Sequence, residues 1–561
     1  MRLRSTLLLS AGPILLVGCG SRGTTAASST EPENVGKTGD ALSAGLHGVA
    51  AANPKAPGVA PATVLSPELS EVLVVQGSAL LENPATLTLA DGTSVTIDRY
   101  GYMGPGPLVP ALGSNVEAQK TEPDKNTYLV LNDQTGPDPT YDYGTHFLFQ
   151  GHEVGIKGQS YITRVNLDAD GPHAVTLWAT TLADGTAIAG IDGSTYDPFA
   201  KRLIFTTENQ NAGIYSSTLD FPPVVEDVSG ALGRGGYEAV QNDTAGNVWI
   251  VEDIGGKTGT INTHARQPNS FLYRFVPKDI KSLKEGRLQA LQLTSLRTGT
   301  PIVFHDGQAD ADILSADTGD IRTYGNVFKA KWVTVHDTDV DGTVPFNANL
   351  AAKAGQATPF KRPENGVFRP GARGLEFFFD ETGDTNLLTE AGSAFGGFGS
   401  IFKLSQKSAS SDDAEVSLFF QCDPVHTGLD NTNFWSKDFI VFVEDAGDTL
   451  HTQRNAFDSA FIFDVRANYA DPKNVPARII AQGRDPSATI DSGLAGTPGF
   501  NNEGDNELTG FHVSNGDPGE DGILGASNPR PFRDGWRVFY TEQHGDNRTW
   551  EIIRRPHGDG D

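Results

Sequence analysis

Residues 197–209 (DPFAKRLIFTTEN) consist of a polar turn, a short apolar strand and then an acidic residue. The same order recurs in residues 242–253 (NDTAGNVWIVED), in 436–448 (SKDFIVFVEDAGD) and, more loosely, in 535–546 (GWRVFYTEQHGD). Because self-similar units are typical of repeat-built β architectures, this pattern predicts a ring of equivalent sheets. A ring brings equivalent strand ends to one centre, so we expect the acidic residues to converge there.

The composition favours one large all-β domain over two or three ordinary domains. The chain has 561 residues, and its 64 Gly and 33 Pro separate short runs rich in Val, Ile, Phe, Tyr, Thr and Trp. Runs that are apolar at consecutive positions, such as residues 439–443 (FIVFV), predict strands covered on both faces, as in a propeller. Residues 337–364 and 485–534 break this rhythm and are predicted to be long loops or insertions, with a helical turn at 350–355.

The charge balance argues against nucleic acid as a partner. Lys and Arg number 43 against 70 Asp and Glu, which gives a formal net charge of −27. Such a field repels a phosphate backbone, and no basic run with interleaved aromatic residues offsets it.

The N-terminus predicts an exported lipoprotein. Arg2 and Arg4 precede an apolar stretch at 7–17 that is too short to span a bilayer as a mature helix. Leu16-Val17-Gly18-Cys19 resembles the lipobox of bacterial lipoproteins, in which the Cys becomes the lipidated first residue. The alternative is an ordinary signal peptide with Cys19 incidental. We expect a protein lipid-anchored to a bacterial membrane, facing either the periplasm or the exterior.

Three segments follow from this interpretation. Residues 1–19 are the predicted signal peptide, and residues 20–67, rich in Ser, Thr, Ala, Gly and Pro, are a predicted flexible tether. Residues 68–561 are the predicted β domain. Cys19 and Cys422 are the two cysteines of the chain, so no disulfide framework is expected within the domain.

Acidic residues after or between the predicted strands are the strongest chemical signal. The set includes Glu153, Glu208, Glu238, Glu364 and Glu507, with Glu252-Asp253 and Glu444-Asp445 in equivalent places. Oxygen donors in this number suit Ca²⁺, which takes about 6 to 8 oxygen ligands, better than Zn²⁺, which prefers His and Cys. The competing interpretation is that these acidic side chains only face solvent at turns and at the edges of sheets.

A second acidic motif is weaker. Residues 337–342 (DTDVDG) begin like a calcium-binding loop, but its twelfth position is Ala348 rather than a bidentate Glu. These residues are therefore expected to lie in an ordinary loop.

Several short motifs together resemble a known family. In chain order they are Gly151-His152-Glu153, Gly236-Tyr237-Glu238, residues 269–279 (NSFLYRFVPKD), Arg362-Pro363-Glu364, Asp430-Asn431 before Glu444-Asp445, and residues 507–510 (ELTG) before Gln543-His544. This series resembles the PhoX-type alkaline phosphatases and their relatives, from about Tyr143 to Asn547.

The resemblance implies a six-bladed β-propeller with a central channel. In that family the channel binds Ca²⁺ and, in the phosphatases, iron, and it hydrolyses phosphate monoesters. The resemblance implies that Glu238 and Glu364 correspond to metal ligands of the family and that Glu507 is a further ligand. It also implies that Arg362 is the cation that holds a phosphoryl oxygen. Glu208 matches the acidic end of the family's Cys-Glu-Glu segment, and Glu153 completes the expected metal-binding set.

One departure from the family concerns iron. Thr206 and Thr207 stand where the iron-ligating Cys is expected. The resemblance therefore supports Ca²⁺ as a cofactor and leaves Fe³⁺ in doubt.

These observations predict a metal-dependent hydrolase of small phosphate monoesters, a monomer attached to the membrane through Cys19. The main alternative is a catalytically inactive calcium-binding propeller that serves as a surface binding or scaffold module. A calcium-dependent lactonase or phosphotriesterase using the same channel is a third option.

Overall fold

The computed structural model of the protein describes residues 44–50, 63–104, 118–169, 171–372, 375–483, 507–523 and 527–556. Cys19, on which the predicted lipid anchor depends, lies outside the described residues, as does most of the predicted tether. Within the described ranges, no helix combines the length and the apolar character needed to cross a membrane.

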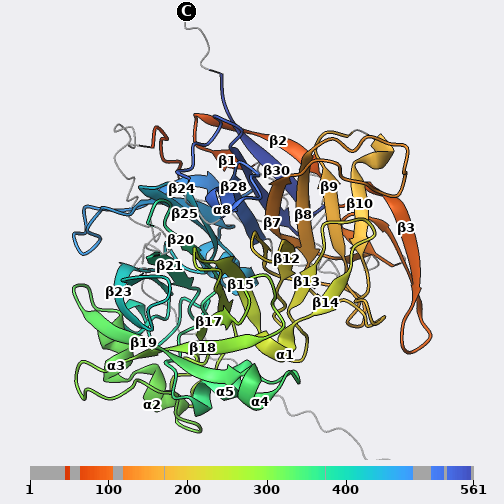
Figure 1. Cartoon of the computed structure of the whole chain (residues 1–561). Helices are drawn as coiled ribbons and strands as arrows, with labels where there is room; N and C mark the ends of the chain where they lie inside the picture. The colour runs from red at the N-terminus through yellow and green to blue at the C-terminus, as the bar shows by residue number, and fades with distance from the viewer. Residues whose placement is uncertain are drawn as a thin grey trace, which may run out of the picture.

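Antiparallel meanders, in which consecutive strands pair as neighbours, make up the fold (Figure 1). Three sheets of the described chain have four strands each. They are β7 (Pro123–Val130), β8 (His146–His152), β9 (Ile162–Asn166) and β10 (Val175–Ala179); β11 (Ser194–Asp197), β12 (Arg202–Phe205), β13 (Tyr215–Ser217) and β14 (Val225–Asp227); and β2 (Leu69–Val75) with β28 (Glu507–Ser514), β29 (Arg537–Gln543) and β30 (Arg548–Arg554).

A five-stranded sheet has the same design. It contains β24 (Leu429–Ser436), β25 (Phe439–Glu444), β26 (Ser459–Asp464), β27 (Ala477–Ala481) and the short strand β1 (Val64–Leu65).

The largest sheet joins two meanders. It runs through β15 (Tyr237–Asn242), β16 (Val248–Glu252), β17 (Leu272–Pro277), β18 (Gly286–Leu293), β19 (Val327–Asp337), β23 (Asp413–Gln421), β22 (Ser400–Gln406), β21 (Glu376–Glu381) and β20 (Gly366–Phe368). Because the long strand β19 pairs with both β18 and β23, two meanders form one nine-stranded sheet. The sheets of the described chain therefore do not divide into the six separate blades of the six-bladed propeller that the resemblance implied.

Two small sheets and a few short helices complete the described structure. The small sheets pair β3 (Leu80–Thr88) with β4 (Ser94–Arg99) and β5 (Tyr102–Met103) with β6 (Gln119–Lys120). The helices are α1 (Ser229–Leu232), α2 (Ala309–Ile313), α3 (Ala316–Ile321), α4 (Thr338–Asp341), α5 (Ala348–Ala354), α6 (Gly447–Arg454) and α8 (Glu520–Ile523), with 3₁₀ turns at Gly171–His173 and Ser393–Phe395. Helices α2 to α5 lie along the outer side of β18 and β19 (Figure 1).

The first strands of the meanders form a closed ring, in which β7, β11, β15, β20, β24 and β28 contact one another in this order and β28 contacts β7. This circular, propeller-like arrangement confirms the predicted all-β class. At the point of closure, β2 from the N-terminal side pairs with β30 from the C-terminal side. Leu46, from the segment predicted as tether, is buried in the adjoining core cluster.

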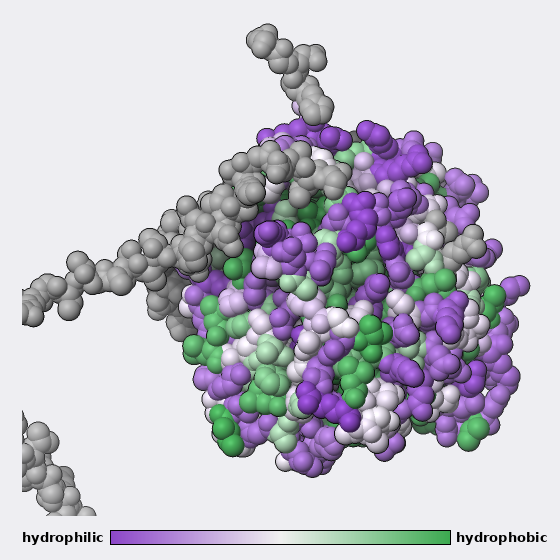
Figure 2. Space-filling model, turned by 90° about the vertical axis from the view of Figure 1, so that its left-hand side faces the viewer, coloured by the Kyte–Doolittle hydropathy of each residue, from purple (hydrophilic) through white to green (hydrophobic). Residues whose placement is uncertain are grey.

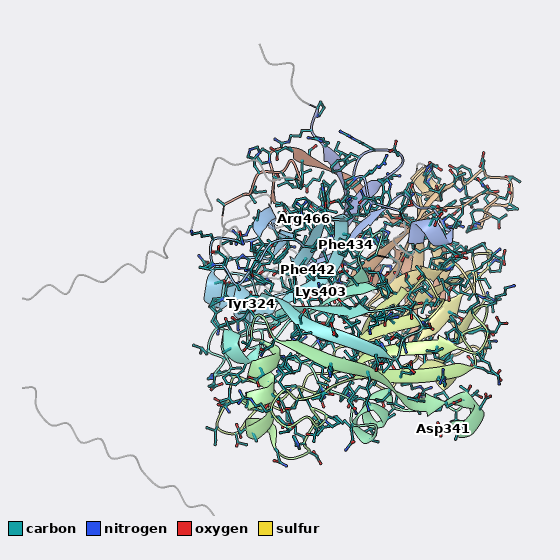
Figure 3. The ribbon with its side chains drawn as sticks, turned by 60° about the vertical axis from the view of Figure 1, so that its left-hand side comes forward. Tyr324, Asp341, Lys403, Phe434, Phe442 and Arg466 are labelled. Atoms are coloured by element: carbon teal, nitrogen blue, oxygen red, sulfur yellow. The ribbon has the colours of Figure 1, made fainter. Side chains whose placement is uncertain are left out.

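The core lies between neighbouring sheets, as the fully apolar strands predicted. All six residues of β25 are buried. Phe434 and Phe442, labelled in Figure 3, belong to a cluster that includes Phe378 of β21. Polar residues dominate the visible surface, with apolar patches scattered among them (Figure 2).

The prediction of a long loop at 485–534 is wrong in part. The segment 485–534 was expected to lack strands, but it contains β28 (Glu507–Ser514). Its sequence, ELTGFHVS, mixes polar and apolar residues because an innermost strand lines the polar centre of the ring. The helical turn expected at 350–355 is confirmed as part of α5 (Ala348–Ala354).

Candidate metal centre

Carboxylates from the innermost strands meet at one end of the ring. Asp124 belongs to β7, Glu238 to β15 and Asp430 to β24, while Glu507 is the first residue of β28. Asp192 and Glu364 each precede an innermost strand, β11 and β20, by two residues. Each of these innermost strands therefore has an acidic residue at or just before its start, at the same rim of the ring.

A second set of acids comes from the ends of the adjacent strands. Glu153 follows β8, Glu208 follows β12 by three residues, Asp253 follows β16, and Asp445 follows β25. In an antiparallel pair, the start of one strand lies beside the end of its neighbour, as in the pairing of Tyr237 with Glu252 and of Leu429 with Glu444. This geometry brings both sets of acids to one place.

β-Bulges orient some of these side chains. An extra residue occurs between Pro123 and Asn126, between Tyr237 and Val240, and between Leu429 and Thr432. These three bulges contain Asp124, Glu238 and Asp430, respectively. A bulge bends the strand and redirects a side chain that regular alternation would place on a sheet face.

Among the described residues, four overlapping groups of carboxylates have ligand atoms within 4.8 Å of one another. The groups are Asp124, Glu153 and Asp192; Asp192, Glu208 and Glu238; Glu208, Asp253 and Glu364; and Glu238, Glu364 and Asp430. We call this continuous set the carboxylate cluster. Its members are buried except for Glu153, which is half-buried, and Glu208, which is exposed. We call the side of the cluster where Glu208 reaches solvent its mouth.

The protonation of the cluster reflects burial and mutual repulsion. Burial, together with the nearby Glu208 and Glu364 carboxylates, raises the pKa of Glu238 well above its ordinary value. Burial and the Asp124 carboxylate likewise raise the pKa of Asp430. The surrounding protein and the Asp253 carboxylate raise the pKa of Glu208 to about 7, although its side chain reaches solvent.

Two buried oxygens of the cluster have no partner in the part of the chain that the structure describes. Glu238 Oε2 and Asp430 Oδ1 are buried and accept no hydrogen bond from any described residue. Buried carboxylate oxygens are normally satisfied, and leaving one unpaired is costly. A cation between these carboxylates would satisfy both oxygens and offset the repulsion.

Lys125 is a buried basic residue close to the carboxylates of Asp124 and Asp430. Its Nζ donates hydrogen bonds to Asn431 Oδ1 at 3.0 Å and to Asn365 Oδ1 at 3.5 Å. Burial lowers the pKa of Lys125, while Asp124 and Asp430 oppose this effect. Lys125 therefore offsets only part of the negative charge of the cluster.

Arg362 lies at the mouth, with 21% of its side chain exposed. Nε and Nη2 donate to the Asp253 carboxylate at 2.9 and 2.7 Å, and Nη2 lies 3.1 Å from Glu364 Oε1. No hydrogen bond joins Nη1 to the part of the chain that the structure describes. The two carboxylates hold the guanidinium in place and leave Nη1 available to a ligand.

The structure thus brings together the predicted residues Glu153, Glu208, Glu238 and Glu364 in the carboxylate cluster, with Arg362 beside them. Glu507 lies near the cluster. Burial raises its pKa, and the nearby Asp445, Glu153 and Asp124 carboxylates raise it further. The roles of these residues as ligands and catalytic groups remain predictions.

Sequence reasoning missed Asp124, Asp192 and Lys125. They lie at the starts of innermost strands, whereas the repeat pointed to acids at strand ends. The signal that could have found them is a short polar strand shortly before each apolar one, as in residues 123–130 (PDKNTYLV).

The weak calcium-loop motif lies elsewhere. Residues 338–341 form α4, and Asp337 caps it by accepting a hydrogen bond from the backbone N–H of Asp339. Asp341 is exposed at the periphery of the molecule (Figure 3).

The ring of antiparallel sheets and its acidic centre define a propeller-like protein with a candidate metal site. Residues 231–449 match the family model of the alkaline phosphatase PhoX, which confirms the resemblance to the PhoX family. The matched segment contains Glu238, Arg362, Glu364 and Asp430. No sequence among curated proteins matches the chain.

A solved structure supports the fold. A structure of Pseudomonas fluorescens PhoX in complex with vanadate, a transition state analogue, is similar with a TM-score of 0.52 and 11% identity, over 91% of this chain and 98% of that chain. A gluconolactonase from Xanthomonas campestris aligns with a TM-score of 0.34 and 10% identity, over 87% and 100% of the two chains. At the latter TM-score the likeness has no bearing on fold or activity.

Proposed function

We propose that the protein is an exported, metal-dependent phosphatase-like hydrolase that acts on phosphate monoesters at the centre of a six-bladed propeller. The blade number follows if β15–β18 and β20–β23 are counted as two blades joined by β19. The PhoX match supports the reaction class. The observation that carries the proposal is the convergence of Glu238, Glu364 and Asp430 in one buried group.

Ca²⁺ is the cation we propose for this site. The four groups of the described chain contain carboxylates alone, without His or Cys, and hard oxygen donors of this kind suit Ca²⁺. Glu238, Glu364, Asp430 and Asp192 would hold it, with Glu153, Glu208 and Glu507 as further ligands.

Iron fits these residues less well. The hydroxyl groups of Thr206 and Thr207, at the place of the family's Cys, donate to the backbone oxygens of Glu238 and Gly213. We therefore do not include Fe³⁺ in the proposal.

Bound Ca²⁺ would polarise the phosphoryl group and offset its charge. Arg362 would donate from Nη1 to a phosphoryl oxygen, while Asp253 and Glu364 fix the direction of its guanidinium. The pKa of Glu208 is about 7 in the metal-free site, whereas bound Ca²⁺ would hold this side chain as a carboxylate. We further propose that Cys19 anchors a monomer to the membrane and that small phosphorylated substrates enter at this mouth.

The test is hydrolysis of p-nitrophenyl phosphate by the purified protein with Ca²⁺, with Fe³⁺ and after chelation. We expect activity with Ca²⁺ and its loss on chelation, since bare carboxylates repel a phosphate. Glu364→Ala should be inactive, and Glu415→Ala, which removes an exposed acid of β23, should match the wild type. Equal, negligible rates in all samples would refute the enzymatic proposal.

A second candidate is a catalytically inactive calcium-binding propeller that serves as a binding or scaffold module. Thr206 and Thr207 favour it, because they replace the residue expected to bind iron. Bound calcium without hydrolysis of monoesters, triesters or lactones would support this candidate.

A further inference from the structure

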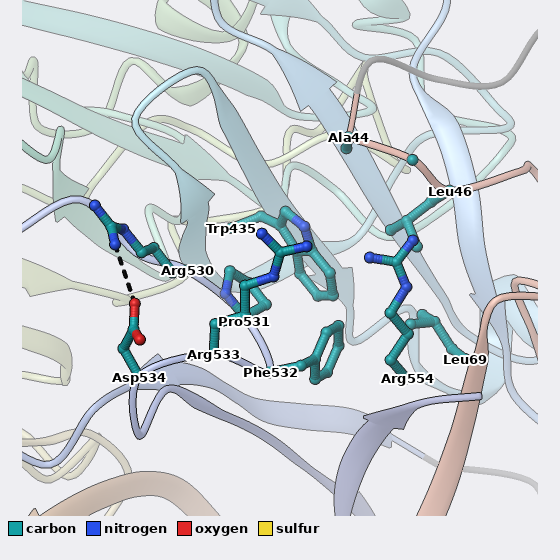
Figure 4. Close-up of a pocket in the computed structure, with 11 residues that line it drawn as sticks. Ala44, Leu46, Leu69, Trp435, Arg530, Pro531, Phe532, Arg533, Asp534 and Arg554 are labelled. Atoms are coloured by element: carbon teal, nitrogen blue, oxygen red, sulfur yellow. Dashed lines mark hydrogen bonds and ion pairs between the residues drawn. The ribbon is translucent and has the colours of Figure 1, made fainter. Parts of the chain in front are cut away.

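A pocket lies far from the carboxylate cluster. It has a volume of about 540 Å³ and is lined by Trp435, Phe532, Arg530, Arg533 and Arg554 together with Leu46 and other residues (Figure 4). Trp435 and Asp430 lie near opposite ends of β24, and a strand of this length separates them by about 17 Å. The pocket is therefore distinct from the candidate metal centre.

Aromatic rings and arginines give this pocket two complementary parts. The rings of Trp435 and Phe532 are 5.5 Å apart in an edge-to-face arrangement, and Trp435 is otherwise buried. The side chains of Arg533 and Arg554 flank the Phe532 ring in Figure 4. Neither arginine has an ion-pair partner among the described residues, although the chain carries a net charge of −27.

The loop at the rim is held in an unusual conformation. Phe532 and Asp534 have φ values of 70° and 53°, in the left-handed region that bulky residues seldom adopt. The Phe532 N–H donates to Trp536 O, and the Trp536 N–H donates to Arg533 O. Arg530 pairs with Asp534 at 3.0 Å, so the one acidic residue lining the pocket is already neutralised.

We propose that this pocket binds an organic anion, with a phosphate or carboxylate group between Arg533 and Arg554 and an apolar ring or chain against Trp435 and Phe532. Its volume lies within the range of about 300 to 1,000 Å³ found for small-molecule sites. Arginine is suited to bind such anionic groups through paired N–H donors. A soluble phosphorylated compound and the headgroup of an anionic phospholipid share this chemistry.

Calorimetric titration with phenylphosphonate, which has no ester bond to hydrolyse, tests binding. In parallel, sedimentation with phosphatidylglycerol or phosphatidylcholine vesicles tests the lipid source, using protein without residues 1–43. The key variant is Arg533→Gln/Arg554→Gln. Arg287→Gln, which alters an exposed arginine of β18, is the matched control.

We expect the double variant to bind one of the two ligands with at least tenfold lower affinity than the wild type does. The control variant should bind as the wild type does. Loss of phenylphosphonate binding identifies a soluble anion as the ligand, whereas loss of selective binding to phosphatidylglycerol identifies a lipid headgroup. Indistinguishable binding by the wild type and the double variant in both assays would overturn the proposal. Because both arginines are exposed, the circular dichroism spectrum of the variant should be unchanged.

Discussion

At the scale of single residues, the centre of the ring is a balance between buried negative charge and the few cations near it. Lys125 and Arg362 offset part of the charge, but buried oxygens of Glu238 and Asp430 have no hydrogen-bond partner among the described residues. Carboxylates in such positions are retained at a cost in stability. The proposed cation site would explain why this chain keeps them.

Lys125→Met provides a residue-scale prediction. This change removes a buried positive charge that acts on the nearby Asp124 and Asp430 carboxylates, so the metal-free variant should unfold at a lower temperature than the metal-free wild type. Added Ca²⁺ should restore more stability to the variant than to the wild type, because the cluster is then more negative. Thermal unfolding with EDTA and with Ca²⁺ measures both effects. Equal stabilisation of the two proteins by Ca²⁺ would contradict this role.

The pH dependence of stability gives another residue-scale prediction. The folded protein raises the pKa of Glu208 to about 7 and that of Glu238 well above its ordinary value, so between the unfolded and folded pKa values the folded state binds more protons. The stability of the metal-free protein should therefore fall as pH rises from about 5 to 8. Bound Ca²⁺ should reduce this slope. The unfolding temperature measured across this range, with and without EDTA, checks the expectation; an identical slope in both conditions would count against it.

At the scale of elements, the sequence predicted the apolar strands better than the polar ones. The run at 439–443 corresponds to β25 (Phe439–Glu444), which is buried throughout. The innermost strands were harder to predict from the sequence. Strands β7, β24 and β28 direct polar side chains to the centre of the ring, so they lack a continuous apolar pattern. The acids Glu153, Glu208 and Glu238 were found from repeats and family motifs, whereas Asp124 and Asp192 were hidden in or before such polar strands.

The aromatic packing of the nine-stranded sheet leads to a prediction at this scale. Trp249 of β16 contacts Trp332 of β19, Phe368 of β20 and Phe377 of β21, at ring-centroid distances of 4.8, 4.9 and 4.9 Å. Trp249→Ala should lower the free energy of unfolding by about 3–5 kcal/mol, because it leaves a cavity where two meanders meet. Urea denaturation measures the loss. Leu388→Ala, at a position that is 62% exposed, should have little effect.

At the scale of the whole molecule, the ring is closed by strands from both ends of the described chain. β2 (Leu69–Val75) adds to β30 (Arg548–Arg554), and β1 (Val64–Leu65) adds to β27 (Ala477–Ala481). Closure of this kind leaves fewer unpaired sheet edges and fixes the innermost strands around one centre. The position of the candidate site therefore depends on pairing between residues almost 500 positions apart.

Truncation tests this closure. Removing residues 1–75 deletes β1 and β2, exposes an edge of β30 and should lower the unfolding temperature or cause aggregation. Removing residues 1–43 should leave the unfolding temperature unchanged, because β1, β2 and Leu46 remain. Calorimetry of the two truncated proteins compares them directly. Equal stability would show that the pairing of β2 with β30 is dispensable.

Calcium binding itself tests the central claim most directly. Elemental analysis of the purified protein, followed by calorimetric titration of the chelated protein, should show bound Ca²⁺ in the wild type. Glu238→Gln should weaken that binding at least tenfold, while Glu415→Gln should leave it unchanged. Absence of calcium from the wild type, or equal affinities in all three proteins, would contradict the assignment of the carboxylate cluster as a metal centre.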